Sequence, residues 1–245
     1  MELRFKLDVY NPAEYYASLG LLELASQQDY EVRSQFESDD TTGANSTFVM
    51  TCKDVLPDLK ALTVTALKYA DPLIAPVRVE GLELNWWMNE FRDRKSNLKL
   101  WAGTSRPVDM LKRFQQVMGG MDGNVLQHSV NVRMGKSSFG FDTRASRDAL
   151  MVGYSQKEAN DPSVIYPETE FLCAVGLQNF RPSKDSYYIW KRPVPVSVAH
   201  AAAVQEIVGL RQSRYTMTVA FVGQGLQAVV RSQKDNTRRM YERAV

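Results

Sequence analysis

An internal repeat constrains the fold of this chain more than any other feature of its sequence. Residues 14–21 (Glu-Tyr-Tyr-Ala-Ser-Leu-Gly-Leu) and residues 170–177 (Glu-Phe-Leu-Cys-Ala-Val-Gly-Leu) match in register, and a Pro shortly precedes each segment. Both segments have a helical pattern, in which Gly costs about 1 kcal/mol relative to Ala. Gly20 and Gly176 therefore need a packing reason, and we predict that each lies close to a sheet.

The repeat also suggests how the chain is organised. We predict a single compact domain over residues 1–245 that consists of two related halves, about 1–120 and 121–245. The length and an apolar content of 44% are sufficient for a substantial core. A repeat of eight positions also fits a coincidence of helical periods, so the two related halves are a hypothesis.

The spacing of apolar residues indicates both strands and helices. Residues 3–9 alternate apolar and charged side chains, which is typical of a strand with one buried face. Asn11 and Pro12 favour a helix start, with Asn11 as the cap and Glu14 reaching back to the Asn11 amide. We predict an α+β fold in which a mixed or antiparallel sheet packs with helices, and two halves that are ferredoxin-like (RRM-like). The predicted strands are 3–9, 31–39, 46–52, 77–87 and 136–143, the helices are 12–27, 54–69, 106–118, one from 167 and one near 198–208, and a hairpin spans 215–231.

Basic charge is concentrated in the middle of the chain. Residues 85–147 contain eleven Lys and Arg against four Asp and one Glu, whereas the first forty residues contain nine acidic and three basic residues. Lys and Arg displace counterions from phosphates, and aromatic rings stack on bases. This composition therefore favours a nucleic-acid partner. The aromatic residues interleaved with the cations are Trp86, Trp87, Phe91, Trp101, Phe114, Phe139 and Phe141.

Two elements of the basic segment are predicted to present cations to a ligand. Residues 92–99 have no clear period, which indicates an exposed loop. The helix predicted at 106–118 has Val108 and Leu111 on one side and cations on the other. A solvated charge cluster and a solvated helix face have the same patterns, so both alternatives are open. The candidate phosphate-binding residues are Arg92, Arg94, Lys95, Lys99, Arg106 and Arg113.

A second group of cations flanks Phe139-Gly140-Phe141. Gly140 would let a strand or an RNA backbone approach closely. Phe139 and Phe141 share a face if this segment is a strand, and that face is either core, which strand aromatics favour, or a stacking platform. Arg144 either pairs with Asp142 or is ordered by it for phosphate binding. The candidate residues of this group are Arg133, Lys136, Arg144 and Arg147.

The sequence also predicts which tryptophans belong to the core. Trp86 and Trp87 are adjacent, so on a strand they point in opposite directions, and at most one of them belongs to the same core. We predict a structural role for Trp101.

No recognisable catalytic centre is present in the sequence. His128 and His200 have no neighbours suited to hydrolysis or metal binding, and Cys52 and Cys173 lack the spacing of a metal motif. We predict that the chain is not an enzyme and binds neither a metal nor a cofactor. The two separated cysteines fit a reducing compartment, and neither a secretion signal nor a membrane-spanning segment is visible, so we expect a cytoplasmic protein.

Several segments of the chain together resemble one family. They are 11–24, 84–87, 98–103, 139–144, 149–155 and 167–182, and they include Leu-Asn-Trp-Trp, Phe-Gly-Phe-Asp-Thr-Arg and Gly-Leu-Gln-Asn-Phe-Arg-Pro. In this order they are similar to the CRISPR-associated proteins of type I-U (also called I-G) systems. Within those systems the chain looks most like the large-subunit group.

This resemblance implies a non-catalytic subunit of an RNA-guided surveillance (Cascade-like) complex in antiviral defence. Such a complex pairs its guide with target DNA and transiently recruits a helicase-nuclease. The implied partners are crRNA and/or target DNA and the other CRISPR-associated effector subunits, with no membrane. The chain has 245 residues, which is short for a large subunit, so recognition of a motif beside the target is left open.

Two alternative functions fit parts of the sequence. The chain could be a protein-only scaffold subunit whose basic segment docks on acidic neighbours. It could instead be a metal-independent crRNA-processing endoribonuclease, which the sequence disfavours because a well-placed His is usually expected as the acid or base.

Overall fold

The computed structural model describes residues 1–38, 45–53, 56–92, 94–101, 105–132, 139–144, 163–182, 185–222 and 226–235. Within these ranges all strand pairs are antiparallel and pack with helices, which confirms the predicted α+β class. None of the helices in these ranges is both long and apolar enough to span a bilayer. The elements are β1 (Glu2–Leu7), α1 (Pro12–Ser26), β2 (Arg33–Ser38), β3 (Ser46–Thr51), β4 (Val64–Ala66), β5 (Val77–Val79), β6 (Leu82–Leu84), α2 (Pro107–Val117), the 3-10 helix η1 (Val125–Gln127), β7 (Val130–Val132), β8 (Ser163–Ile165), α5 (Pro167–Asn179), β9 (Ser186–Trp190), β10 (Val194–Pro195), α6 (Val196–Val204), β11 (Gln212–Val222) and β12 (Leu226–Lys234).

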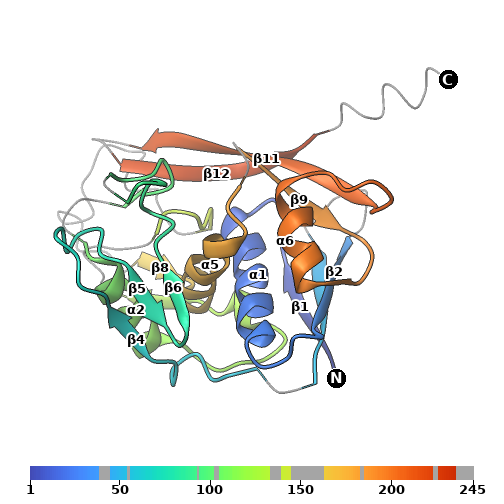
Figure 1. Ribbon diagram of the computed structural model, residues 1–245, viewed down its shortest axis with the longest axis horizontal. Coiled ribbons are helices and arrows are strands. Elements are labelled where there is room, and N and C mark those ends of the chain that lie inside the picture. The colour runs from blue at the N-terminus through green and yellow to red at the C-terminus, as the bar shows by residue number, and fades with distance from the viewer. Residues whose placement is uncertain are drawn as a thin grey trace.

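Helices α1 and α5 lie side by side at the centre of the molecule (Figure 1). Near their N-terminal ends, Arg144 contacts both helices, through Glu14 Oε1 at 3.1 Å and Thr169 Oγ1 at 3.3 Å. Near their C-terminal ends, Asn179 Nδ2 donates to Glu23 Oε1 at 2.7 Å. The two helices of the repeat therefore run parallel, and nearly all of their residues are buried.

The two glycines of the repeat lie where α1 and α5 touch. A Cβ atom on Gly20 would lie 2.1 Å from the backbone oxygen of Leu172, and one on Gly176 would lie 2.0 Å from that of Tyr16. Each Gly thus has the packing reason that the sequence demanded. The predicted neighbour is wrong, because each Gly approaches the backbone of the other helix and not a sheet.

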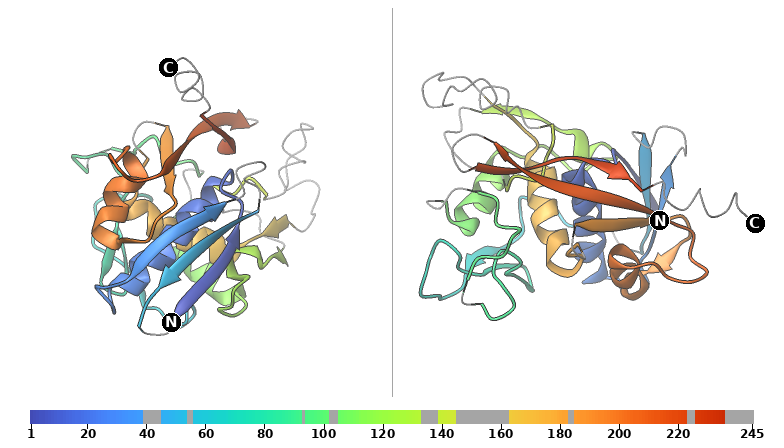
Figure 2. Two further views of the ribbon diagram at one scale, coloured as in Figure 1. Left: turned by 90° about the vertical axis from the view of Figure 1, so that its right-hand side faces the viewer. Right: turned by 90° about the horizontal axis from the view of Figure 1, so that it is seen from above.

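Two sheets enclose this helical pair. One is the four-stranded sheet β1-β3-β2-β10, and the other is the three-stranded sheet β12-β11-β9, whose β11–β12 hairpin runs over the helices (Figure 2). Aromatic rings fill the space between the layers. Tyr15 of α1 stacks on Tyr187 of β9 with centroids 4.3 Å apart and on Phe36 of β2 at 5.6 Å, and Phe36 meets Trp190 edge-on at 5.0 Å. The core is thus built around α1, whose residues are nearly all buried.

Some predicted elements differ from those observed. The described part of 54–69 contains turns and the strand β4 in place of a helix, because the β-branched run Thr63-Val64-Thr65 favours extended backbone. The single strand predicted at 77–87 is the short hairpin β5–β6, which turns at Glu80 with φ 49°. Residues 139–143 are not a strand, and 136–138 lie outside the described residues.

The predicted ferredoxin-like halves are not confirmed. The first half has the order β1-α1-β2-β3 with β3 between β1 and β2 in the sheet. The second half departs from it, because β8, which precedes α5, pairs with β7 in a separate sheet and does not join β9 and β11. The repeat therefore describes a pair of helices and not two equivalent sheets.

Candidate nucleic-acid interface

The first cluster of predicted cations lies in the segment that follows β6, of which the structure describes residues 85–92 and 94–101. Residues 88–99, which we call the basic loop, begin with a bridge between Met88 and Lys95, and Asn89 N donates to Arg94 O at 2.9 Å. At its tip Arg92 N donates to Asn89 O at 3.0 Å, and Arg92 has a left-handed backbone with φ 59°. Most of its described residues between 90 and 97 are exposed, as predicted, and the backbone hydrogen bonds join residues 89, 92 and 94.

Two tryptophans attach the base of the basic loop to the core. Trp86 Nε1 donates to Ala174 O of α5 at 2.8 Å, and Trp87 Nε1 donates to Ile74 O at 2.9 Å. Both side chains are fully buried and contact each other edge to face at 5.2 Å. The prediction that at most one of them belongs to the same core is wrong. They lie in a turn beyond the end of β6, where the alternation of a strand does not apply.

Most aromatic residues of the basic segment belong to the core. Phe139 and Phe141 contact Trp86 at 5.8 and 5.6 Å and are fully buried, so they form no stacking platform. Trp101 is buried against the same rings, which agrees with a structural role. Phe91 is the exception. It lies at the tip of the basic loop with 83% of its surface exposed.

The cations of the basic loop differ in their surroundings. Arg92, Arg94 and Lys95 are all exposed, and Arg92 pairs with Glu83 at 3.0 Å. Lys99 is half-buried, with Nζ 4.5 Å from the Trp101 ring centroid and donating to Trp101 O at 3.0 Å. Burial and the charge of Lys95 lower the pKa of Lys99 to about 8. Burial is the larger of the two causes, in keeping with the position of Lys99 against the Trp101 ring.

Helix α2 places Arg106 near the basic loop. Arg106 lines a cavity of about 580 Å³ together with Lys68 and Tyr69. The hydroxyl of Tyr69 donates to the backbone oxygen of Arg92, so this cavity adjoins the tip of the loop. Arg106 pairs with Asp109 at 2.6 Å, and Arg113 lies two turns further along the same exposed side of α2. Sequence reasoning missed Lys68 and Tyr69, because it placed both in a helix.

Arg144 has a different environment from the other candidates. Its guanidinium bonds to Asp142 through Nε at 3.0 Å and Nη2 at 2.8 Å, and Nη1 donates to Leu126 O at 2.9 Å. Its Cζ also lies 3.6 Å from the centroid of the Tyr166 ring. Hence Arg144 forms a pair with Asp142, one of the two alternatives considered for it, inside a polar network of the protein. Arg133, Lys136 and Arg147 lie outside the described residues.

The structure therefore brings together five of the ten candidates, namely Arg92, Arg94, Lys95, Lys99 and Arg106. Comparisons of the chain with models of known protein families, with curated proteins and with solved structures found no match.

Proposed function

We propose that this chain binds nucleic acid through the basic loop, without catalysing a reaction on it. One observation carries the proposal: Phe91 is 83% exposed on a loop whose described residues are joined by backbone hydrogen bonds, with Arg92, Arg94 and Lys95 close by in the chain. A single exposed ring is common on a protein surface, so it is the cations next to Phe91 that distinguish this loop. A ring that stacks on an unpaired base, beside cations that contact phosphates, is the arrangement of single-strand binding sites.

The attachment of the basic loop to the core supports this proposal. The basic loop is attached through Trp86 to α5 and through Trp87 to the segment before β5, so its base cannot move without disrupting the core. The base of the loop is thus fixed to the core before a ligand arrives. A preorganised site loses less conformational entropy on binding than a free loop does.

The resemblance to type I-U (I-G) CRISPR proteins supplies the proposed context. We propose a subunit of an RNA-guided surveillance complex, with crRNA and/or target DNA, the other effector subunits and a transient helicase-nuclease as its partners. Several residues that carry the resemblance meet in the core around Trp86, including Trp101, Phe139 and Phe141. They are explained by packing, so the binding surface must come from the exposed residues between them.

Purification of the chain with its genomic neighbours tests this context. We expect a discrete RNA to co-purify, and added precursor RNA to stay intact. Cleavage of the precursor would favour the endoribonuclease alternative. A complex that holds its RNA equally well without this chain would favour the protein-only scaffold.

We expect the double variant Arg94→Ala/Lys95→Ala to bind single-stranded oligonucleotides more weakly and to lower the slope of log K against log salt by about 1.5. Both side chains are exposed, so the fold should not change. Fluorescence anisotropy at several salt concentrations measures the slope. Lys6→Ala/Arg33→Ala is the matched control, since it also removes one exposed Lys and one exposed Arg, from β1 and β2. Equal slopes for the two variants would refute the assignment.

We expect Phe91→Ala to raise the Kd for a single-stranded oligonucleotide by about 5- to 150-fold, which corresponds to one stacked base. Phe91→Trp should keep the affinity, because it retains a flat ring. Tyr30→Ala is the control, since Tyr30 is an aromatic side chain with a similar exposed fraction of 80%. If Phe91→Ala and Tyr30→Ala bind alike, Phe91 does not stack on a base.

A further inference from the structure

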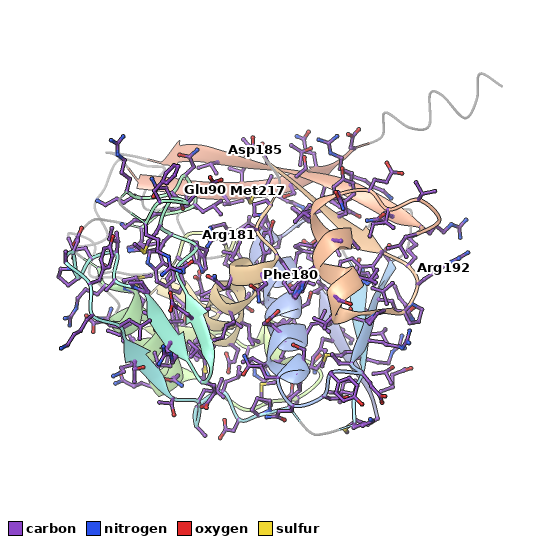
Figure 3. All side chains as sticks on the ribbon, viewed as in Figure 1. Glu90, Phe180, Arg181, Asp185, Arg192 and Met217 are labelled. Atoms are coloured by element: carbon purple, nitrogen blue, oxygen red, sulfur yellow. The ribbon has the colours of Figure 1, made fainter. Side chains whose placement is uncertain are left out.

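Arg181 has an unsatisfied donor at a well-defined position. It lies just beyond the end of α5, between the segment that follows β6 and α6 (Figure 3). Its Nη2 donates to Asn85 Oδ1 at 2.9 Å, and its Nε is buried without a hydrogen-bond partner among the described residues. A buried N–H group without an acceptor is costly, so such a group calls for an explanation.

A second guanidinium is connected to Arg181 through two residues. Arg92 pairs with Glu83 Oε1 at 3.0 Å, and the same oxygen accepts from Asn85 Nδ2 at 3.2 Å, next to the Asn85 Oδ1 that binds Arg181. Burial lowers the pKa of Arg181, and the positive charge of Arg92 lowers it further. Arg92 has Glu83 as a counter-ion, but Arg181 forms no ion pair within the described residues. Arg181 is therefore a half-buried cation without an acid of its own among the described residues.

Asn85 holds Arg181 in a fixed orientation. Its Oδ1 also accepts from Gln178 Nε2 at 3.3 Å, its N donates to Gln178 Oε1 at 2.8 Å, and its Nδ2 donates to Glu83 Oε1 at 3.2 Å. These bonds connect the C-terminal end of α5 to the start of the segment that carries the basic loop. Hydrogen bonds to both α5 and the segment that follows β6 thus fix the position of the guanidinium, although the aliphatic part of the Arg181 side chain is flexible.

We propose that Arg181 and Arg92 together bind a phosphate group. An oxyanion accepts from a guanidinium through two parallel N–H bonds, which would satisfy Nε, and its charge would offset the repulsion between the two arginines. The inference rests on the proposed function, because Arg92 belongs to the basic loop. It identifies the bound group as a backbone phosphate next to the base that stacks on Phe91.

Thermal unfolding in inorganic phosphate tests the site directly. At 20 mM phosphate and matched ionic strength, the Tm of the unaltered protein should rise by about 2 to 5 °C over its value in chloride. Arg181→Ala should abolish the rise. Arg181→Lys should abolish most of it, because Lys keeps the charge but loses the paired donors. Arg33→Ala is the control and should keep the full rise. An equal rise in the Arg181 variants and in Arg33→Ala would overturn the proposal.

Oligonucleotide binding separates this site from the proposed function. With a single-stranded oligonucleotide, Arg181→Ala should reduce the salt slope by about one phosphate contact. If phosphate stabilises the protein through Arg181 but no oligonucleotide binds, the anion site is real and the proposed function is wrong. If oligonucleotides bind through Arg94 and Lys95 while Arg181→Ala changes neither measurement, the site is wrong and the proposed function stands.

Discussion

Replacing Gly20 by Ala is expected to destabilise the protein by about 3 kcal/mol. The added Cβ would lie 2.1 Å from Leu172 O and 2.8 Å from Leu172 C, which are backbone atoms of α5 and cannot turn aside. The clash can be relieved only if α1 and α5 move apart, which loosens the packing between these two helices. Gly176→Ala should have a similar effect through Tyr16 O. Chemical denaturation followed by far-UV circular dichroism measures the free energy of unfolding.

Two other glycines provide the controls for this prediction. A Cβ on Gly81 or Gly120 would meet no atom within 4 Å. Gly81→Ala and Gly120→Ala should therefore change the free energy of unfolding by less than about 1 kcal/mol in either direction. The proposed contact between the helices would be refuted if Gly20→Ala were as mild as these two variants.

Arg144→Ala is expected to cost about 3 to 5 kcal/mol, because it leaves buried carboxylates without their cation. Glu14 and Asp142 are both about 1% exposed or less, and Arg144 lies between them. Although burial opposes it, the hydrogen bonds and the charge of Asp142 raise the pKa of Arg144, which is therefore charged throughout the accessible pH range. The double variant Glu14→Gln/Arg144→Ala should recover part of the loss, because it removes one uncompensated charge.

The cost of Arg144→Ala should depend on pH. Burial raises the pKa of Glu14 above its ordinary value of 4.5, while the charge of Arg144 acts in the opposite direction. Since the folded state holds this proton more tightly than the unfolded state, the contribution of Glu14 is most favourable below pH 4.5 and is lost as the pH rises through the folded-state pKa. Without Arg144 that pKa rises further. The difference in stability between the two proteins should therefore be larger at pH 7 than at pH 5.

Equilibrium unfolding at both pH values measures this difference. Arg33→Ala, which removes an exposed Arg on β2, is the control and should stay within about 0.5 kcal/mol of the unaltered protein. A loss of stability in Arg144→Ala as small as that of the control would show that the Arg144 network contributes little. Weaker nucleic-acid binding by Arg144→Ala must be interpreted together with the stability of this variant, because a loss of folded protein also weakens binding.

Much of the fold could be predicted from local patterns. The strands β1, β2 and β3, the helices α1, α2 and α5, and the hairpin β11–β12 all have a clear period or a clear start signal in the sequence. The basic loop was predicted from the absence of a period. Local patterns were insufficient at 54–69, where a mixture of apolar and polar residues fits helix spacing, although Thr63-Val64-Thr65 favours a strand.

The candidate site was only partly predictable for a related reason. A sequence shows that residues 88–99 are polar and basic, but not that Tyr69, Arg106 and Arg181 lie around them. Those neighbours come from segments far apart in the chain. The aromatic residues were misleading as a group, because six of the seven are buried and Phe91 alone is exposed.

The sequence by itself determined the class of the fold, the two matching helices with their glycines, and the position of the basic loop. Each of these depends on residues that are neighbours in the chain, where periodicity and turn chemistry act. Only the tertiary structure decided that Gly20 and Gly176 meet α5 and α1, that Trp86 and Trp87 share one core, and that Arg144 is held inside the protein. Periodicity shows which face of an element is apolar, but the surface that covers this face depends on contacts between distant residues.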